Sequence, residues 1–143
     1  MEVGNYDPVR FPLRDLTDKI IGCFYDVYNE LGFGFLECVY HTAMQLALEQ
    51  KGIHAEWKPK ITVYFRGALV GSFEPDLIVE GKVILEFKAV EELASAHEAQ
   101  LLNYLKASDI ELGLLLNFGP KPKVRRFTFG NDRKRSRPPI TVE

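Results

Sequence analysis

The segment Phe73–Lys88 reads FEPDLIVEGKVILEFK and has the pattern of two short strands joined near Gly81. Apolar residues occupy alternate positions in each half, which predicts one buried face of an antiparallel hairpin. The residues of this face are Leu77, Val79, Val83, Leu85 and Phe87. The side chains between them must point to the opposite side of the sheet.

The expected loop sets the register of this hairpin. A three-residue loop at 79–81, with its glycine in the left-handed conformation, pairs Asp76 with Ile84. This register leaves Asp76, Glu86 and Lys88 together on the second face. A two-residue loop would move Asp76 onto the apolar face, so the apolar pattern favours the longer loop.

Three charged groups on the second face suggest a metal site. Carboxylates from neighbouring strands, here Asp76 and Glu86, offer the oxygen ligands that hard divalent cations such as Mg²⁺ favour. A bound cation would activate a water and polarise a phosphoryl oxygen, and Lys88 would orient that water or offset developing charge. Taken alone, Glu-x-Lys at strand spacing is more typical of a solvated hairpin face.

Two further motifs accompany this pattern. Pro75-Asp76, nine residues and then Glu86-Phe87-Lys88 resembles the signature of the PD-(D/E)xK nuclease superfamily. Upstream, GFLECVY at 34–40 resembles the motif that names the GxxExxY proteins, one branch of that superfamily. Downstream, QLLNY at 100–104 is similar to the Gln-x-x-x-Tyr helix motif of exonuclease-like members. The three motifs occur in the expected order between about 32 and 129.

This resemblance implies an α/β (α+β) fold with a restriction-endonuclease-like αβββαβ core, in which helices flank a mixed central sheet. It implies that Asp76 and Glu86 hold Mg²⁺ or Mn²⁺, with the backbone carbonyl of Phe87 as a further ligand. Glu37 would complete the metal site directly or through water. On local grounds, a carboxylate in the first turn of a helix is also favoured by the helix dipole.

The resemblance assigns Lys88 to positioning or activating the nucleophile, so the catalytic set is Asp76, Glu86, Lys88 and Glu37. Gln100 and Tyr104 would contact substrate or order the site, although a surface amide and a packed ring account for them equally well. Tyr40 is a core residue by default, with a supporting role by resemblance. Trp57 is expected to be a hydrophobic anchor, and His41 has no partner at ligand spacing.

Other segments have clear local patterns. Helices are expected at about 15–31, 36–51 and 95–106, with Asp15 or Thr17 capping the first and Ser95, with Glu98, capping the third. Strands are expected at 61–65, 68–70, 111–117 and 124–129. The segment from Lys88 to the strand at 111 is suited to a right-handed parallel crossover.

The 143 residues suit one domain, with an extended lead-in at 1–14 and a basic tail at 131–143. The net charge of −2 does not indicate nucleic-acid binding, so any such surface must come from local clustering such as the basic residues after 120. No apolar run suits a membrane span. Cys23 and Cys38 are expected to be buried free thiols, which suits a cytoplasmic protein.

These patterns lead to two hypotheses. The first is a metal-dependent nuclease that hydrolyses phosphodiester bonds, with DNA as the favoured nucleic acid. The second is a non-catalytic module that binds nucleic acid or protein on a nuclease-like scaffold. A chain this short offers little surface beyond its core to hold a long duplex, so a homodimer or a partner protein is consistent with either.

Overall fold

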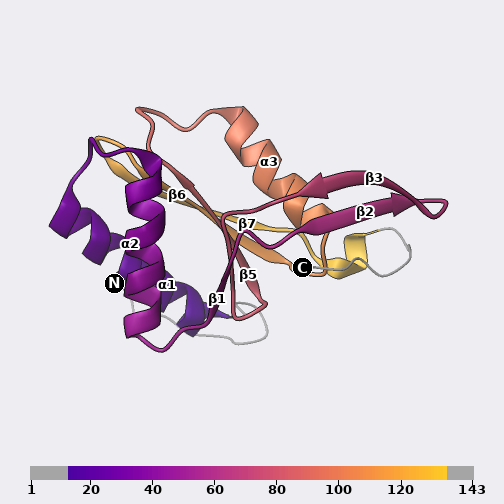
Figure 1. Ribbon diagram of the computed structural model, residues 1–143, viewed down its shortest axis with the longest axis horizontal. Coiled ribbons are helices and arrows are strands. Elements are labelled where there is room, and N and C mark those ends of the chain that lie inside the picture. Colours follow the sequence, from indigo (N-terminus) through magenta and orange to yellow (C-terminus); the bar gives the residue numbers. More distant parts are fainter. Residues whose placement is uncertain (1–12, 135–143) are drawn as a thin grey trace.

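A five-stranded mixed sheet forms the centre of the protein in a computed structural model that describes residues 13–134 (Figure 1). In spatial order its strands are β1 (Ala55–Trp57), β4 (Leu77–Val79), β5 (Val83–Lys88), β6 (Leu112–Phe118) and β7 (Pro122–Thr128). The β5–β6 pair is parallel and the other pairs are antiparallel. The predicted fold class is confirmed, and residues 1–12 of the lead-in and 135–143 of the tail lie outside the described range.

Helices cover both faces of this sheet. On one face, α1 (Arg14–Leu31) and α2 (Glu37–Gln50) share a hydrophobic cluster with the predicted apolar face of the hairpin. On the other face, α3 (Ser95–Lys106) packs on Ile78 and Ile84. A separate hairpin, β2 (Ile61–Phe65) and β3 (Ala68–Phe73), begins beside α3 and extends away from the body (Figure 1). Because α3 connects two neighbouring parallel strands, it forms the expected crossover.

The predicted register of the β4–β5 hairpin is wrong by two residues. Leu77 pairs with Leu85 and Val79 with Val83, so the loop consists of residues 80–82. Glu80 takes a left-handed conformation (φ 53°), where its backbone N–H donates to His54 O (2.8 Å) and its side chain accepts from His54 N (2.7 Å). A shift of two residues keeps every side chain on its predicted face, so the apolar pattern could not distinguish the two registers.

The second face of this hairpin is not solvated, contrary to the local expectation. Glu86 is only 4% exposed because β5 is a central strand and α3 crosses over it. Strands with a parallel neighbour are usually covered on both faces. An unpaired carboxylate in this environment is unfavourable, so this burial itself calls for a functional explanation.

Helix ends agree with the predicted ranges to within two residues, but their N-terminal caps differ. Leu13, in a left-handed conformation (φ 66°), precedes α1 in place of Asp15 or Thr17. The residue before α3 is Ala94, and its N–H donates to Nδ1 of His97 (3.1 Å), so this contact replaces the predicted Ser95 cap. Tertiary packing supplies the stability that strong caps would add.

Two smaller expectations can be compared with the described residues. Cys23 is buried as expected, whereas Cys38 is exposed because it lies on the outer side of α2. None of the helices within 13–134 combines the length and apolar character needed to cross a bilayer.

Candidate metal centre

The site lies where strands β4 and β5 separate. Beyond the Leu77–Leu85 pair the ladder stops, and side chains take over its hydrogen bonds. The backbone N–H of Asp76 donates to Oε1 of Glu86 (2.9 Å), and the N–H of Phe87 donates to Oδ2 of Asp76 (2.8 Å). These reciprocal bonds hold the two carboxylates side by side at the opening.

Helix α2 brings a second pair of groups to the same place. Glu37 is its first residue and His41 lies one turn later, so the two share a face. His41 Nε2 is 3.3 Å from Oε1 of Glu37 and 3.5 Å from Oδ2 of Asp76. One ligand atom from each of the three residues lies within 4.8 Å of the others, which is the arrangement of a cation site.

His41 fits a metal ligand better than a structural histidine. It is 8% exposed, and its Nε2 has no hydrogen-bond partner among the described residues, although two carboxylate oxygens lie within 3.5 Å. A buried polar atom without a partner is costly. An imidazole nitrogen that faces two carboxylates, once it carries no proton, would complete a mixed nitrogen and oxygen donor set for a divalent cation.

Burial raises the pKa of both carboxyl groups in the absence of a cation. Desolvation, followed by the charge of Asp76, raises the pKa of Glu86 from 4.5 to about 8. Desolvation likewise raises the pKa of Asp76, while the Phe87 amide, His41 and Lys88 act in the opposite direction. A bound cation would stabilise the ionised forms that burial disfavours.

Lys88 follows Glu86 by two residues on β5, so strand alternation directs both side chains to the α3 side of the sheet. Its positive charge lowers the pKa of both Asp76 and Glu86, which indicates that it lies near them. The predicted role of the Phe87 carbonyl as a ligand stays a prediction. The segment after Lys88 is fixed by the side-chain amide of Asn117. The Val90 N–H donates to Asn117 Oδ1 (3.0 Å), and Asn117 Nδ2 donates to Val90 O (2.9 Å).

Helix α3 brings Tyr104 to the carboxylates. Tyr104 is 5% exposed, and burial followed by the charges of Glu86 and Asp76 raises the pKa of Tyr104 to about 12, against a lowering contribution from its hydrogen bond with Gln100. Gln100 itself is exposed. The Gln-x-x-x-Tyr pair therefore lies beside the site, with the ring inside and the amide at the surface.

Tyr40 lies elsewhere. It is fully buried, with its ring stacked on Phe118 at 4.4 Å between centroids. Its hydroxyl donates to Gly32 O (2.7 Å) and accepts from Phe35 N (3.2 Å). These contacts hold the α1–α2 connector and so fix where α2, and with it Glu37, begins. This structural function accounts for Tyr40, and its role toward substrate stays a prediction.

Basic residues line the sheet on the same side as Glu86. Across the strands, Glu86 is in register with Leu115 and Arg125, and Lys88 is in register with Asn117 and Lys123. Register partners point to the same face, so Lys123 and Arg125 lie two strands from the carboxylates on the α3 side. They add positive charge to this side of the sheet, where Glu91 and Glu92 line the same hollow as Lys123 and Arg125.

Sequence reasoning missed His41 and the position of Trp57. The four-residue spacing of Glu37 and His41 was the available signal, because it places both on one helix face. Trp57 is 43% exposed and its ring lies 5.3 Å from that of His41, edge to face. Trp57 and His41 are not separated by a helix or strand repeat along the chain, so the sequence pattern could not predict that their rings meet.

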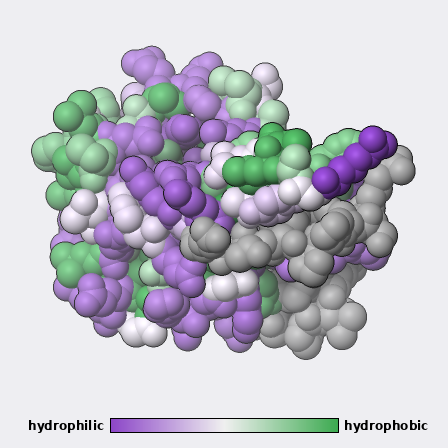
Figure 2. All heavy atoms as spheres, turned by 45° about the vertical axis from the view of Figure 1, so that its right-hand side comes forward, coloured by the Kyte–Doolittle hydropathy of each residue, from purple (hydrophilic) through white to green (hydrophobic). Residues whose placement is uncertain are grey.

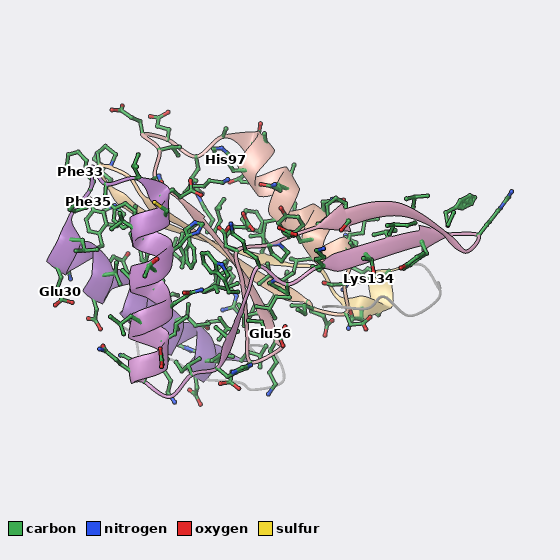
Figure 3. The ribbon with its side chains drawn as sticks, viewed as in Figure 1. Glu30, Phe33, Phe35, Glu56, His97 and Lys134 are labelled. Atoms are coloured by element: carbon green, nitrogen blue, oxygen red, sulfur yellow. The ribbon has the colours of Figure 1, made fainter. Side chains whose placement is uncertain are left out.

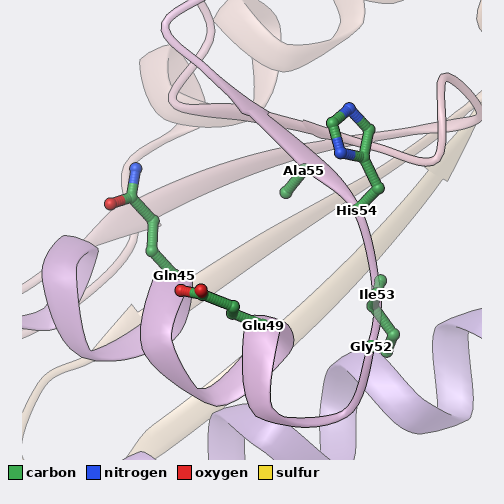
Figure 4. A pocket seen from close by; sticks show the side chains of 6 residues that line it. All are labelled: Gln45, Glu49, Gly52, Ile53, His54 and Ala55. Carbon is green, nitrogen blue, oxygen red and sulfur yellow. The ribbon is translucent and has the colours of Figure 1, made fainter.

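One pocket of about 500 Å³ lies apart from these groups (Figure 4). It is lined by Gln45, Glu49, Gly52, Ile53, His54 and Ala55. None of the candidate metal residues lines it, so it is not the site described above.

Comparisons with known proteins agree with this geometry. The family model described as the PD-(D/E)XK nuclease superfamily matches residues 14–127. A solved structure described as "Crystal structure of SSO0001" is similar, with a TM-score of 0.53 and 18% identity, and this likeness shows the fold alone. It covers 86% of this chain and 62% of that one, so the chain spans less than two thirds of that protein. No curated protein matches significantly.

Proposed function

The chain belongs to the PD-(D/E)XK nuclease superfamily, and we propose that it is a divalent-metal-dependent nuclease that hydrolyses phosphodiester bonds of nucleic acid, with DNA favoured. The observation that carries this proposal is the cluster of Glu37, His41 and Asp76 beside the buried Glu86. The GFLECVY motif at 34–40 supports a place in the GxxExxY branch.

Asp76, Glu86 and Glu37 would hold Mg²⁺ or Mn²⁺, and His41, whose Nε2 faces Glu37 and Asp76, would be a further ligand. The cation would supply activation of a water and polarisation of a phosphoryl oxygen. His41 is part of helix α2 and its Nε2 faces Asp76, so it joins the two sides of the site. Glu86, whose pKa near 8 leaves it largely protonated at neutral pH without a cation, would release that proton when the site fills.

Lys88 would orient the attacking water and offset the negative charge that develops on the phosphoryl oxygens. During hydrolysis a water oxygen would form a bond to phosphorus and lose a proton to solvent, the bond between phosphorus and the leaving oxygen would break, and that oxygen would take up a proton from solvent. Tyr104 and Gln100 would support the substrate beside the carboxylates. Lys123 and Arg125 would contact phosphates further along the strand, which predicts salt-dependent binding.

Cleavage assays on linear DNA, circular DNA and RNA, with Mg²⁺, Mn²⁺ or chelator, test this proposal. We expect cleavage that needs a cation and disappears in Asp76→Ala. Lys88→Ala should retain metal binding and lose cleavage by a factor of about a hundred or more. Equal cleavage by the parent and Asp76→Ala would identify a contaminant, and nucleic-acid binding without cleavage would favour the non-catalytic module.

A further inference from the structure

The segment Trp57–Phe73, here called the aromatic arm, projects from the body next to the metal centre (Figure 1). It joins β1 to β4, so both of its ends attach to strands that flank the site. At its base, the backbone N–H of Lys58 donates to O of Asp76 (3.0 Å). The arm is therefore bonded directly to a residue of the candidate metal centre.

The arm has an unusual charge for this protein. It contains Lys58, Lys60 and Arg66 and no acidic residue, whereas the whole chain has a net charge of −2. Acidic residues flank it only at the base, where Glu56 lies on β1, away from the hairpin tip (Figure 3). Local clustering of positive charge in an acidic protein fits a polyanionic ligand.

The arm also exposes large apolar side chains. Trp57 is 43% exposed, and Tyr64 and Phe65 are each 49% exposed, with Leu69 and Val70 at 57% and 61%. Apolar surface is visible along the arm in the space-filling view (Figure 2). The base of the hairpin does have a core, because Ile61 is buried and Phe73 lies 5.8 Å from the Tyr104 ring. The exposed part is thus an extension beyond that core, with apolar surface that a ligand could cover.

Cations accompany two of the exposed rings. Lys58 Nζ lies 5.3 Å from the centre of the Trp57 ring, and Arg66 Cζ lies 4.7 Å from that of Phe65. Proteins that bind single-stranded nucleic acid combine aromatic rings, on which bases stack, with cations that contact phosphates. Bases within a duplex are already stacked on each other, so exposed ring faces favour an unpaired strand.

Trp57 links the aromatic arm to the candidate metal centre. Its ring contacts the His41 ring (5.3 Å between centroids), and His41 Nε2 faces Glu37 and Asp76. A base stacked on the exposed part of Trp57 would therefore bring its phosphate close to the metal cluster. From the proposed nuclease function and these contacts, we infer that the aromatic arm binds an unpaired nucleic-acid strand, with Trp57 as the base platform beside the cleavage site.

Trp57 is the only tryptophan in the chain, so its fluorescence reports on this contact directly. The 143-residue chain, in chelator to prevent cleavage, is titrated with an unpaired oligothymidylate and with a duplex of the same length. We expect saturable quenching by the unpaired strand and at least tenfold weaker binding of the duplex. Quenching by neither, or equal affinity for both, would overturn the inference.

Variants locate the binding to the arm. Phe65→Ala should weaken binding of a labelled unpaired strand about tenfold or more, and Trp57→Phe should retain more affinity than Trp57→Ala. The matched control is Phe33→Ala, because Phe33 is 60% exposed on the α1–α2 connector, far from the arm (Figure 3). Each variant is first checked for an unchanged melting temperature. Equal effects of Phe65→Ala and Phe33→Ala would contradict the assignment.

The outcomes separate this inference from the proposed function. Strand binding by the metal-free protein without cleavage in Mg²⁺ or Mn²⁺ would refute the nuclease proposal and leave the arm's role intact. Cleavage of duplexes with unchanged fluorescence of Trp57 would refute the arm's role and leave the nuclease. If Phe65→Ala instead changes the sedimentation of the protein without changing strand binding, the arm contacts a second copy of the chain.

Discussion

Raising the pH should destabilise the metal-free protein between pH 5 and 7, through Glu86. Burial and the charge of Asp76 raise the pKa of Glu86 from 4.5 to about 8 in the folded protein, whereas the unfolded chain keeps an ordinary carboxyl group. Between these values the folded state binds more protons than the unfolded state. The free energy of unfolding must therefore fall as the pH rises.

The size of this effect follows from proton linkage. One proton held only by the folded state changes the free energy of unfolding by about 1.4 kcal/mol per pH unit. From pH 5 to 7 the loss from Glu86 is therefore on the order of 3 kcal/mol, and Asp76, whose pKa is also raised by burial, acts in the same direction. A divalent cation at one hundred times its Kd should restore about 2.7 kcal/mol at pH 7.

Urea unfolding at several pH values, with chelator and then with Mn²⁺, measures these quantities. Glu86→Gln should reduce the slope, because the amide keeps an acceptor for the Asp76 N–H and cannot titrate. Glu30→Gln is the control, since Glu30 is an exposed glutamate on α1 (Figure 3). Stability in chelator that is constant or rising from pH 5 to 7, or a slope unaffected by Glu86→Gln, would refute the reasoning.

Four further substitutions test the site and its supports. His41→Ala should weaken Mn²⁺ binding at least tenfold by calorimetry, and unchanged affinity would exclude His41 as a ligand. Tyr40→Phe should cost about 1 kcal/mol of unfolding free energy through its lost hydroxyl bonds, with Mn²⁺ affinity unaltered. Gly119→Ala should destabilise by about 2 kcal/mol or more, because its Cβ would lie 2.0 Å from Val90 O. Gly22→Ala on α1 should instead stabilise by roughly 0.5–1 kcal/mol, because its Cβ would make only an ordinary contact with Lys51 Nζ at 3.9 Å. A similar effect of both glycine substitutions on chemical unfolding would contradict this account.

The local pattern of the chain was sufficient for its main elements. Alternation in residues 77–87 predicted which side chains are buried against α1 and α2, because strand side chains alternate faces whatever the register. The helix at 95–106 has the predicted bounds. The motif around Asp76 and Glu86 indicated the superfamily that the family comparison now shows.

Tertiary structure decided the rest, because the remaining contacts join residues that are distant along the chain. The hairpin register depends on Glu80 and His54, and the burial of Glu86 depends on α3 crossing β5. The approach of His41 to Asp76, and of Trp57 to His41, arises only when α2 packs beside β1 and β5. Sequence periodicity reports the face on which a side chain lies, whereas the partner across that face is set by how whole elements pack.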